Sequence, residues 1–253
     1  MAIEGLIFDL GHTLMYLNRK WPDVFAQGVT DLAAFLDARG LDLDGEAFGR
    51  ALLERRSEGF ARARQTLREV TAEESMRWTF GRFGLLDPAP ELIYSAIDAF
   101  FAYEDANWLA YTEARPVLEE LSARGLRLGM FSNATHDPFI QGLVDRLGFR
   151  AWLDPVLSSA GTGIRKPDPA AFAPILAAWD LTPSSVVMVG DTLEADILGA
   201  RRAGMRSVWL RPEEAARQEG TAASGSSVPV PAEPDRSISR LAELPACLET
   251  LET

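Results

Sequence analysis

Side chains that bind cations and anions follow separate apolar runs along this sequence, each run typical of a buried strand. They are three carboxylates, a hydroxyl, an amide and an ammonium group: Asp9, Asp191, Asp196, Ser132, Asn133 and Lys166. Carboxylates at one point repel one another unless a cation joins them, and a hard divalent ion such as Mg²⁺ takes oxygen ligands. A hydroxyl and an ammonium group beside that ion can hold phosphate oxygens. The set therefore predicts a magnesium-assisted phosphate site.

The order of the predicted elements brings these residues to one place. The chain opens with a short apolar run at residues 3–8, and from about residue 113 strands alternate with helices. Such alternation is typical of right-handed βαβ units, which form a doubly wound parallel sheet with helices on both faces. Ligands bind these sheets at the carboxyl ends of the strands, where the strand order reverses. We therefore predict a Rossmann-like α/β core with the polar residues on one rim.

Residues 16–112 have a different pattern, which predicts an all-helical domain inserted after the first strand. Apolar residues recur there at helical spacing, and breaks at Gly40, Gly84 and residues 87–90 separate about four helices without a strand signal. The core is then formed by residues 1–15 and 113–253. Within it, residues 213–235 are rich in Gly, Ser and Pro and lack an apolar period, which predicts a flexible surface loop.

Other polar and aromatic residues outside the rim are predicted to be structural. The arginines of the insert alternate with glutamates at helical spacing, which is typical of a solvated helix face. These arginines are Arg55, Arg56, Arg62, Arg64 and Arg68. His136 lies at a helix start and is expected to be a capping or surface group. The aromatic residues of the insert, Trp108 among them, are expected to fill the core of the insert.

Composition and charge exclude several classes of function. The chain has 253 residues, 47% of them hydrophobic and 25% charged, as in an ordinary globular protein of one or two domains. Its formal net charge of −12 repels phosphate backbones and anionic lipids, so neither nucleic acid nor a membrane is an expected partner. One cysteine, with no leader peptide and no long apolar stretch, predicts a cytoplasmic location. Nothing in the sequence indicates an oligomeric state.

The spacing of the rim residues resembles that of the haloacid dehalogenase (HAD) superfamily of hydrolases. The likeness lies in four motifs in family order: Asp9-Leu-Gly-His-Thr-Leu14, Ser132-Asn133, Lys166-Pro167, and Gly190-Asp191 followed by Asp196. The insert after the first motif is similar to a cap of the C1 type, and the resemblance covers roughly residues 1–210 and 236–251. It implies a Mg²⁺-dependent phosphatase that acts on a small phosphorylated metabolite through an aspartyl-phosphate intermediate.

The resemblance also implies a role for each motif residue. Asp9 would be the nucleophile that takes the phosphoryl group. The phosphate oxygens would be held by Ser132, Asn133 and Lys166. The Mg²⁺ ligands would be Asp9, Asp191 and the backbone carbonyl of Gly11, with Asp196 in support through water or Lys166.

Gly11 departs from the pattern of the family's phosphatases, which carry a second aspartate two residues after the nucleophile. That aspartate protonates the leaving group, and general acid–base catalysis contributes typically ~10²–10⁴-fold to a rate. Its loss predicts a slow enzyme, a substrate with a good leaving group, or a substitute acid. His12 is the nearest candidate for an acid, a base or a substrate ligand, because an imidazole titrates near neutral pH.

The missing aspartate leaves two alternatives to a phosphatase. A 2-haloacid dehalogenase-like hydrolase also lacks it, because halide leaves without a proton. The dehalogenases that this chain resembles are metal-independent, however, and do not use the aspartate that stands here as Asp191. The other alternative is a catalytically weak member that binds a phosphorylated ligand for regulation. The phosphatase is the favoured interpretation.

Overall fold

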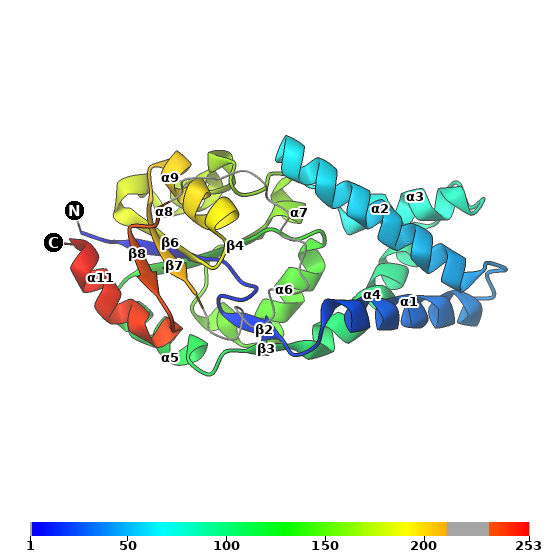
Figure 1. The fold of residues 1–253 in the computed structure, drawn as a ribbon, viewed down its shortest axis with the longest axis horizontal. Coiled ribbons are helices and arrows are strands. Elements are labelled where there is room, and N and C mark those ends of the chain that lie inside the picture. The colour runs from blue at the N-terminus through cyan, green and yellow to red at the C-terminus, as the bar shows by residue number, and fades with distance from the viewer. Residues whose placement is uncertain (1, 212–232, 253) are drawn as a thin grey trace.

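The computed structural model describes residues 2–211 and 233–252, and at its centre is a six-stranded parallel sheet (Figure 1). The strand order is β5-β4-β1-β6-β7-β8. In chain order the strands are β1 (Gly5–Phe8), β4 (Arg127–Ser132), β5 (Val156–Ser158), β6 (Val186–Gly190), β7 (Arg206–Leu210) and β8 (Arg236–Ile238). The chain builds β4 and β5 on one side of β1 and then crosses to build the other three strands. This reversal confirms the predicted doubly wound α/β fold and puts its switch point at the end of β1.

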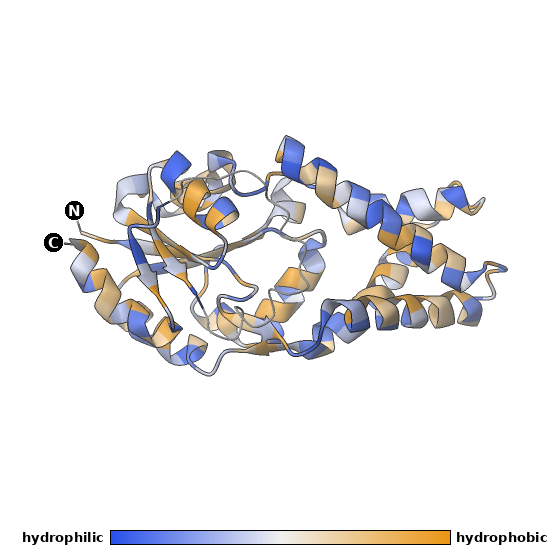
Figure 2. Cartoon of the chain, viewed as in Figure 1, coloured by the Kyte–Doolittle hydropathy of each residue, from blue (hydrophilic) through white to orange (hydrophobic). Residues whose placement is uncertain are grey.

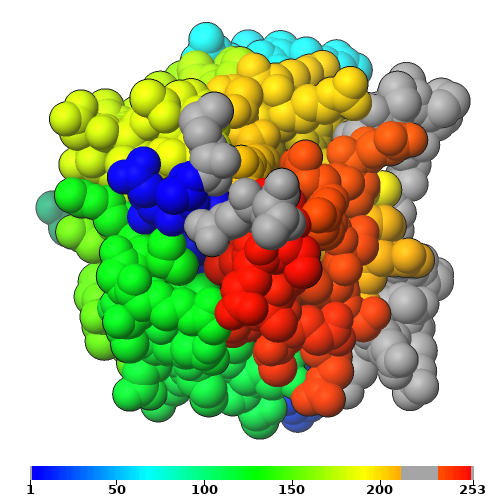
Figure 3. Space-filling view, turned by 90° about the vertical axis from the view of Figure 1, so that its left-hand side faces the viewer, coloured from blue at the N-terminus to red at the C-terminus, as the bar shows by residue number. Residues whose placement is uncertain are grey.

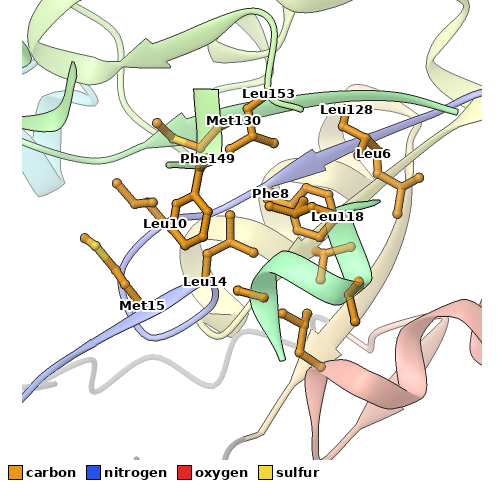
Figure 4. Close-up of a cluster of buried hydrophobic side chains, with 14 of the residues drawn as sticks. Leu6, Phe8, Leu10, Leu14, Met15, Leu118, Leu128, Met130, Phe149 and Leu153 are labelled. Atoms are coloured by element: carbon orange, nitrogen blue, oxygen red, sulfur yellow. The ribbon is translucent and has the colours of Figure 1, made fainter. Parts of the chain in front are cut away.

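Alternate residues of the central strand enter two apolar layers. Leu6 and Phe8 pack against helices on one face, as Figure 4 shows, and Ile7 packs against helices on the other. The first layer contains α5 (Ala114–Ala123), α6 (Asp137–Arg146) and α11 (Leu244–Glu252). The second contains α8 (Ala173–Trp179) and α9 (Leu198–Ala203). Burying a Leu, Ile or Phe side chain contributes ~1.5–3 kcal/mol, so the strand that leads to Asp9 is firmly held.

Four helices lie between β1 and α5 and pack around an apolar cluster of their own (Figure 1). They are α1 (Trp21–Ala38), α2 (Gly45–Thr66), α3 (Ala72–Arg82) and α4 (Pro90–Asn107). The start of α2 is capped by the side chain of Asp44, and Thr71 and Glu74 form a capping box at the start of α3. Figure 2 shows hydrophilic residues along the outer side of α2. The four helices stand beside the carboxyl edge of the sheet.

The insert differs from the prediction because it is not all-helical. The strands β2 (Met15–Leu17) and β3 (Trp108–Ala110) pair antiparallel where the chain enters and leaves it. Strands of three residues are too short to show an alternating pattern, so no apolar period indicates them.

The predicted solvated face of the insert is wrong at Arg56, which is only 8% exposed. Its guanidinium carbon lies 5.0 Å and 4.9 Å from the ring centres of Phe100 and Phe101 in α4. Charge spacing along one helix reports neighbours on that helix alone. It could not reveal that α4 covers this part of α2.

Most of the predicted flexible loop, residues 213–232, lies outside the described residues. Its last residue, Asp235, is held in place because its carboxylate accepts hydrogen bonds from the backbone N–H (2.8 Å) and hydroxyl (3.0 Å) of Ser207. The strand β8 that follows was not predicted. Figure 3 shows the N-terminal segment and α11 on the same face of the molecule, away from the insert. Among the described residues, no helix is long and apolar enough to cross a membrane.

Candidate active site

Lys166 is the centre of a buried polar cluster at the carboxyl end of β1. Its Nζ lies 2.6 Å from Oδ1 of Asp9 and 2.7 Å from Oδ1 of Asp196. It also donates a hydrogen bond of 2.7 Å to the backbone oxygen of Phe131 in β4. The ammonium group thus donates hydrogen bonds to Asp9 and to Phe131, and its charge also pairs with Asp196. Residues more than 150 positions apart in the chain thus meet here, because the parallel strands end on one rim.

Asp191 brings a third carboxylate to the cluster. One oxygen from each of Asp9, Asp191 and Asp196 can be chosen so that all three lie within 4.8 Å of one another. Three carboxylates against one ammonium group leave two negative charges uncompensated. An all-oxygen donor set with this charge fits a divalent cation such as Mg²⁺.

The pKa values of Asp9, Asp191 and Lys166 are all raised, the first two mainly by burial and the third by its neighbouring carboxylates. Burial raises the pKa of Asp9 to about 6, with Lys166 opposing and Asp196 adding to the rise. Burial, together with the charges of Asp9 and Asp196, raises the pKa of Asp191 well above its usual value. Burial alone would lower the pKa of Lys166, but the two aspartates overcome it and the pKa is raised. The ammonium group stays charged, and the carboxylates gain from a further cation.

Asp196 is fixed by the turn that follows β6. Its Oδ2 accepts a hydrogen bond of 2.9 Å from the backbone N–H of Thr192, and its Oδ1 pairs with Lys166. A Cβ at Gly190 would come within 2.3 Å of Cγ of Asp196, so only glycine fits there. The helical segment after β6 starts as a π-helical turn, Leu193–Ile197, in which Asp196 is buried. Its Oδ1 is buried beside Lys166 but has no hydrogen-bond partner among the described residues, and its predicted support of the metal site through water or Lys166 stays a prediction.

Ser132 and Asn133 have different surroundings although they are neighbours. Ser132 ends β4, is 8% exposed, and makes no side-chain hydrogen bond to the described part of the chain. The amide of Asn133 donates to the backbone oxygen of Lys166 and accepts from its backbone N–H, both at 2.9 Å. This use of Asn133 differs from its predicted contact with phosphate, because the amide pairs with a backbone unit. Asn133 instead orients the loop of Lys166.

Trp108 covers the position where the second aspartate of the phosphatases would stand. A Cβ at Gly11 would lie 3.4 Å from Cη2 of the Trp108 ring, which belongs to the apolar cluster of the core and not to that of the insert. Its Nε1 donates a hydrogen bond of 3.2 Å to Glu104, a carboxyl whose pKa is raised by burial. The predicted place of Trp108 is therefore wrong. It packs on the loop that follows Asp9 because β3 returns the chain beside β2.

His12 stands beside the same indole. Its backbone is left-handed at φ 60°, and its N–H donates a hydrogen bond of 2.6 Å to the backbone oxygen of Met15. Its ring lies 5.5 Å from that of Trp108, and burial lowers its pKa. A lowered pKa leaves the imidazole neutral at pH 7, so it can accept a proton more readily than it can supply one.

His136 is not the capping or surface residue that the sequence predicts. It is 6% exposed and its side chain makes no cap hydrogen bond at the start of α6. Its ring is stacked on Phe101 of α4 with the centres 5.9 Å apart. It joins the insert to the core, and such a contact between distant segments leaves no local signal.

We expect Lys166→Met to destabilise the metal-free protein by roughly 3–5 kcal/mol, because two buried carboxylates lose their cation. Urea unfolding in EDTA measures the change. Lys20→Met is the matched control, since Lys20 is the only other lysine and is exposed, and its effect should stay within about 0.5 kcal/mol. Equal effects of the two substitutions would contradict the charge balance described here.

Comparison with known proteins places the chain in a family. A family model described as haloacid dehalogenase-like hydrolase matches residues 3–204. The chain belongs to this family of hydrolases. Among solved structures, a 2-haloacid dehalogenase from Pseudomonas syringae pv. Tomato DC3000 is 26% identical, with a TM-score of 0.68 over 98% of this chain and 99% of that one.

Two curated relatives in this family are named as phosphatases. A phosphoserine phosphatase of Thermus thermophilus is 39% identical over 130 residues, 50% of this chain and 51% of that protein. A ribulose-1,5-bisphosphate 5-phosphatase of Halopiger xanaduensis is 37% identical over 150 residues, 56% of this chain and 61% of that protein. The matches thus span about half to three-fifths of the length of these relatives.

Proposed function

We propose that this protein is a Mg²⁺-dependent phosphatase that hydrolyses a small phosphorylated metabolite through an aspartyl-phosphate on Asp9. The observation that carries the proposal is the cluster of three carboxylates around Lys166 at the end of β1. It offers a nucleophile, a fixed positive charge and an oxygen donor set for a divalent ion. The phosphatase names of the two relatives support the same class of reaction.

In the proposed reaction, an oxygen of Asp9 attacks phosphorus and the bond from phosphorus to the leaving group breaks. The ammonium of Lys166, fixed by Phe131 and Asp196, balances negative charge beside the attacking oxygen. The hydroxyl of Ser132 is free to donate to a phosphate oxygen. Water then cleaves the aspartyl-phosphate and regenerates Asp9. Mg²⁺, when bound by Asp9 and Asp191, would offset the remaining negative charge of the carboxylates and phosphate.

A 2-haloacid dehalogenase-like hydrolase is the second candidate function. Two observations favour it: Gly11 offers no acid, and the chain matches a 2-haloacid dehalogenase over nearly its whole length. Asp191 argues against it, because a third carboxylate beside the nucleophile would repel a carboxylate substrate unless a cation is bound. A family member that only binds a phosphorylated ligand would show binding of that ligand, without phosphatase or dehalogenase activity.

A metal titration tests the proposal. We expect phosphate release from monoesters in Mg²⁺ and none in EDTA, and we expect Mg²⁺ to raise the melting temperature. Saturation to about 100 times Kd stabilises a protein by ~2.7 kcal/mol. Asp191→Asn should remove most of this shift, whereas Glu119→Gln, which alters an exposed carboxylate of α5, should keep it. Chloride release from a 2-haloacid that EDTA does not affect would instead support the dehalogenase.

A further inference from the structure

The insert contacts the core at a second place besides the β2–β3 ribbon. The turn between α2 and α3 reaches the loop after α7 (Ser159–Thr162), as the end of α2 shows in Figure 1. The backbone N–H of Glu69 donates to the oxygen of Gly163 (3.1 Å), and that of Arg165 donates to the oxygen of Leu67 (3.0 Å). The insert is therefore seated directly on the loop that leads into Lys166.

The side chain of Glu69 is buried in this contact, with 1% of its surface exposed. Its Oε2 accepts from the guanidinium of Arg165 at 2.5 Å and from the hydroxyl of Ser159 at 2.5 Å. The same hydroxyl oxygen accepts from the backbone N–H of Ala134 at 2.9 Å. A buried carboxylate needs such partners, and losing one leaves an uncompensated charge. Glu69 thus ties the insert to two separate core loops.

These two loops carry the residues proposed to hold phosphate. Ala134 follows Ser132 and Asn133, and Arg165 precedes Lys166. The amide of Asn133 closes the connection, because it pairs with both backbone groups of Lys166. Hydrogen bonds, together with the short covalent segments between them, therefore connect Glu69 of the insert to Lys166, whose ammonium group lies beside Asp9.

We infer that Glu69 is a positioning residue, which uses the seating of the insert on the core to fix the loop of Lys166 relative to Asp9. This role rests on the proposed phosphatase function. Glu69 pairs with Arg165, which precedes Lys166, and with Ser159, which holds the backbone of Ala134, so it acts through these two residues. A misplacement of a catalytic group by about 1 Å can cost ~10²-fold in rate. Loss of the Glu69 charge should therefore lower kcat and leave metal binding intact.

Glu69→Gln keeps the shape and an acceptor for Ser159 but loses the charge that holds Arg165. With p-nitrophenyl phosphate as the probe, we expect kcat to fall by ~10–10²-fold while KM changes by less than about threefold. The Mg²⁺-induced rise in melting temperature should persist. Arg165→Gln should lower kcat by a similar factor. The double variant Glu69→Gln/Arg165→Gln should have a kcat close to that of each single variant. Glu58→Gln is the control, because Glu58 is an exposed carboxylate of α2 that pairs with Arg55 of the same helix at 3.5 Å.

Hydrogen exchange separates this inference from the proposed function. In Glu69→Gln, amides of residues 133–136 and 163–168 should exchange faster, and those of β6 should not. An unchanged kcat, or unchanged exchange in both loops, would overturn the role of Glu69. If the wild type releases no phosphate at all, the proposed function fails. In that case faster exchange in these loops still supports the coupling, and unchanged exchange overturns it.

Discussion

Asp9→Asn is expected to remove phosphate release, by a factor on the order of 10⁶ as for the loss of other enzymatic nucleophiles. An amide oxygen is a poor nucleophile, although asparagine keeps the shape of the side chain and can still accept from Lys166. The second measurement is trapping of the phosphorylated protein by acid quench from a radiolabelled substrate. Wild-type protein should be labelled, and Asp9→Asn should not.

The fold of this variant can be checked independently of its activity. Burial raises the pKa of Asp9 from 3.8 to about 6, so its carboxylate, although mostly ionised at pH 7, makes the metal-free folded protein less stable at that pH. A neutral asparagine should therefore not lower the melting temperature in EDTA. Retention of more than about 1% of wild-type turnover by a folded Asp9→Asn protein would contradict the role of Asp9 as nucleophile.

The sheet and the convergence of the motif residues could be predicted because both depend on patterns along the chain. A buried parallel strand is a continuous apolar run, and the order of strands and helices determines where the strands end. All four residues of β1 are buried, as its sequence predicts. Asp9 and Asp191 follow neighbouring strands of the sheet, so their meeting follows from topology alone.

The features that were missed depend on neighbours distant in the chain. Trp108 reaches Gly11 only because β3 pairs with β2, and each of these strands has three residues. Glu69 is one of several glutamates in the insert, and nothing near it in the sequence marks the one that pairs with Arg165. The amide of Asn133 pairs with the backbone of Lys166, which its place in a motif does not reveal, and its contact with phosphate stays a prediction. Tertiary packing determines all three.

Gly11→Asp is expected to restore an acid for the leaving group, but only where the indole of Trp108 gives way. Among residues 2–211 and 233–252, apart from the chain neighbours of Gly11, the Trp108 ring alone lies within 4 Å of a Cβ at Gly11, and the ring edge is already at 3.4 Å. A carboxyl group added there must share its space with Cη2 and Cζ3 of that edge. Trp108→Phe removes the edge and keeps an aromatic ring. We therefore expect Gly11→Asp/Trp108→Phe to gain more activity than Gly11→Asp.

The gain should depend on the leaving group. Without a proton donor at position 11, the wild type should hydrolyse aryl and acyl phosphates faster than alkyl phosphates. Their leaving groups, phenolates and carboxylates, are stable anions, whereas an alkoxide is not. Its phosphorylated intermediate should also accumulate, since position 11 has no carboxylate that could activate water. The double variant should raise kcat for glycerol phosphate by up to ~10²–10⁴-fold and change p-nitrophenyl phosphate much less. Trp108→Phe alone is the control and should show no such preference. A wild type that hydrolyses alkyl and aryl phosphates equally fast, and still does so after His12→Ala, would show that the missing acid does not limit this enzyme.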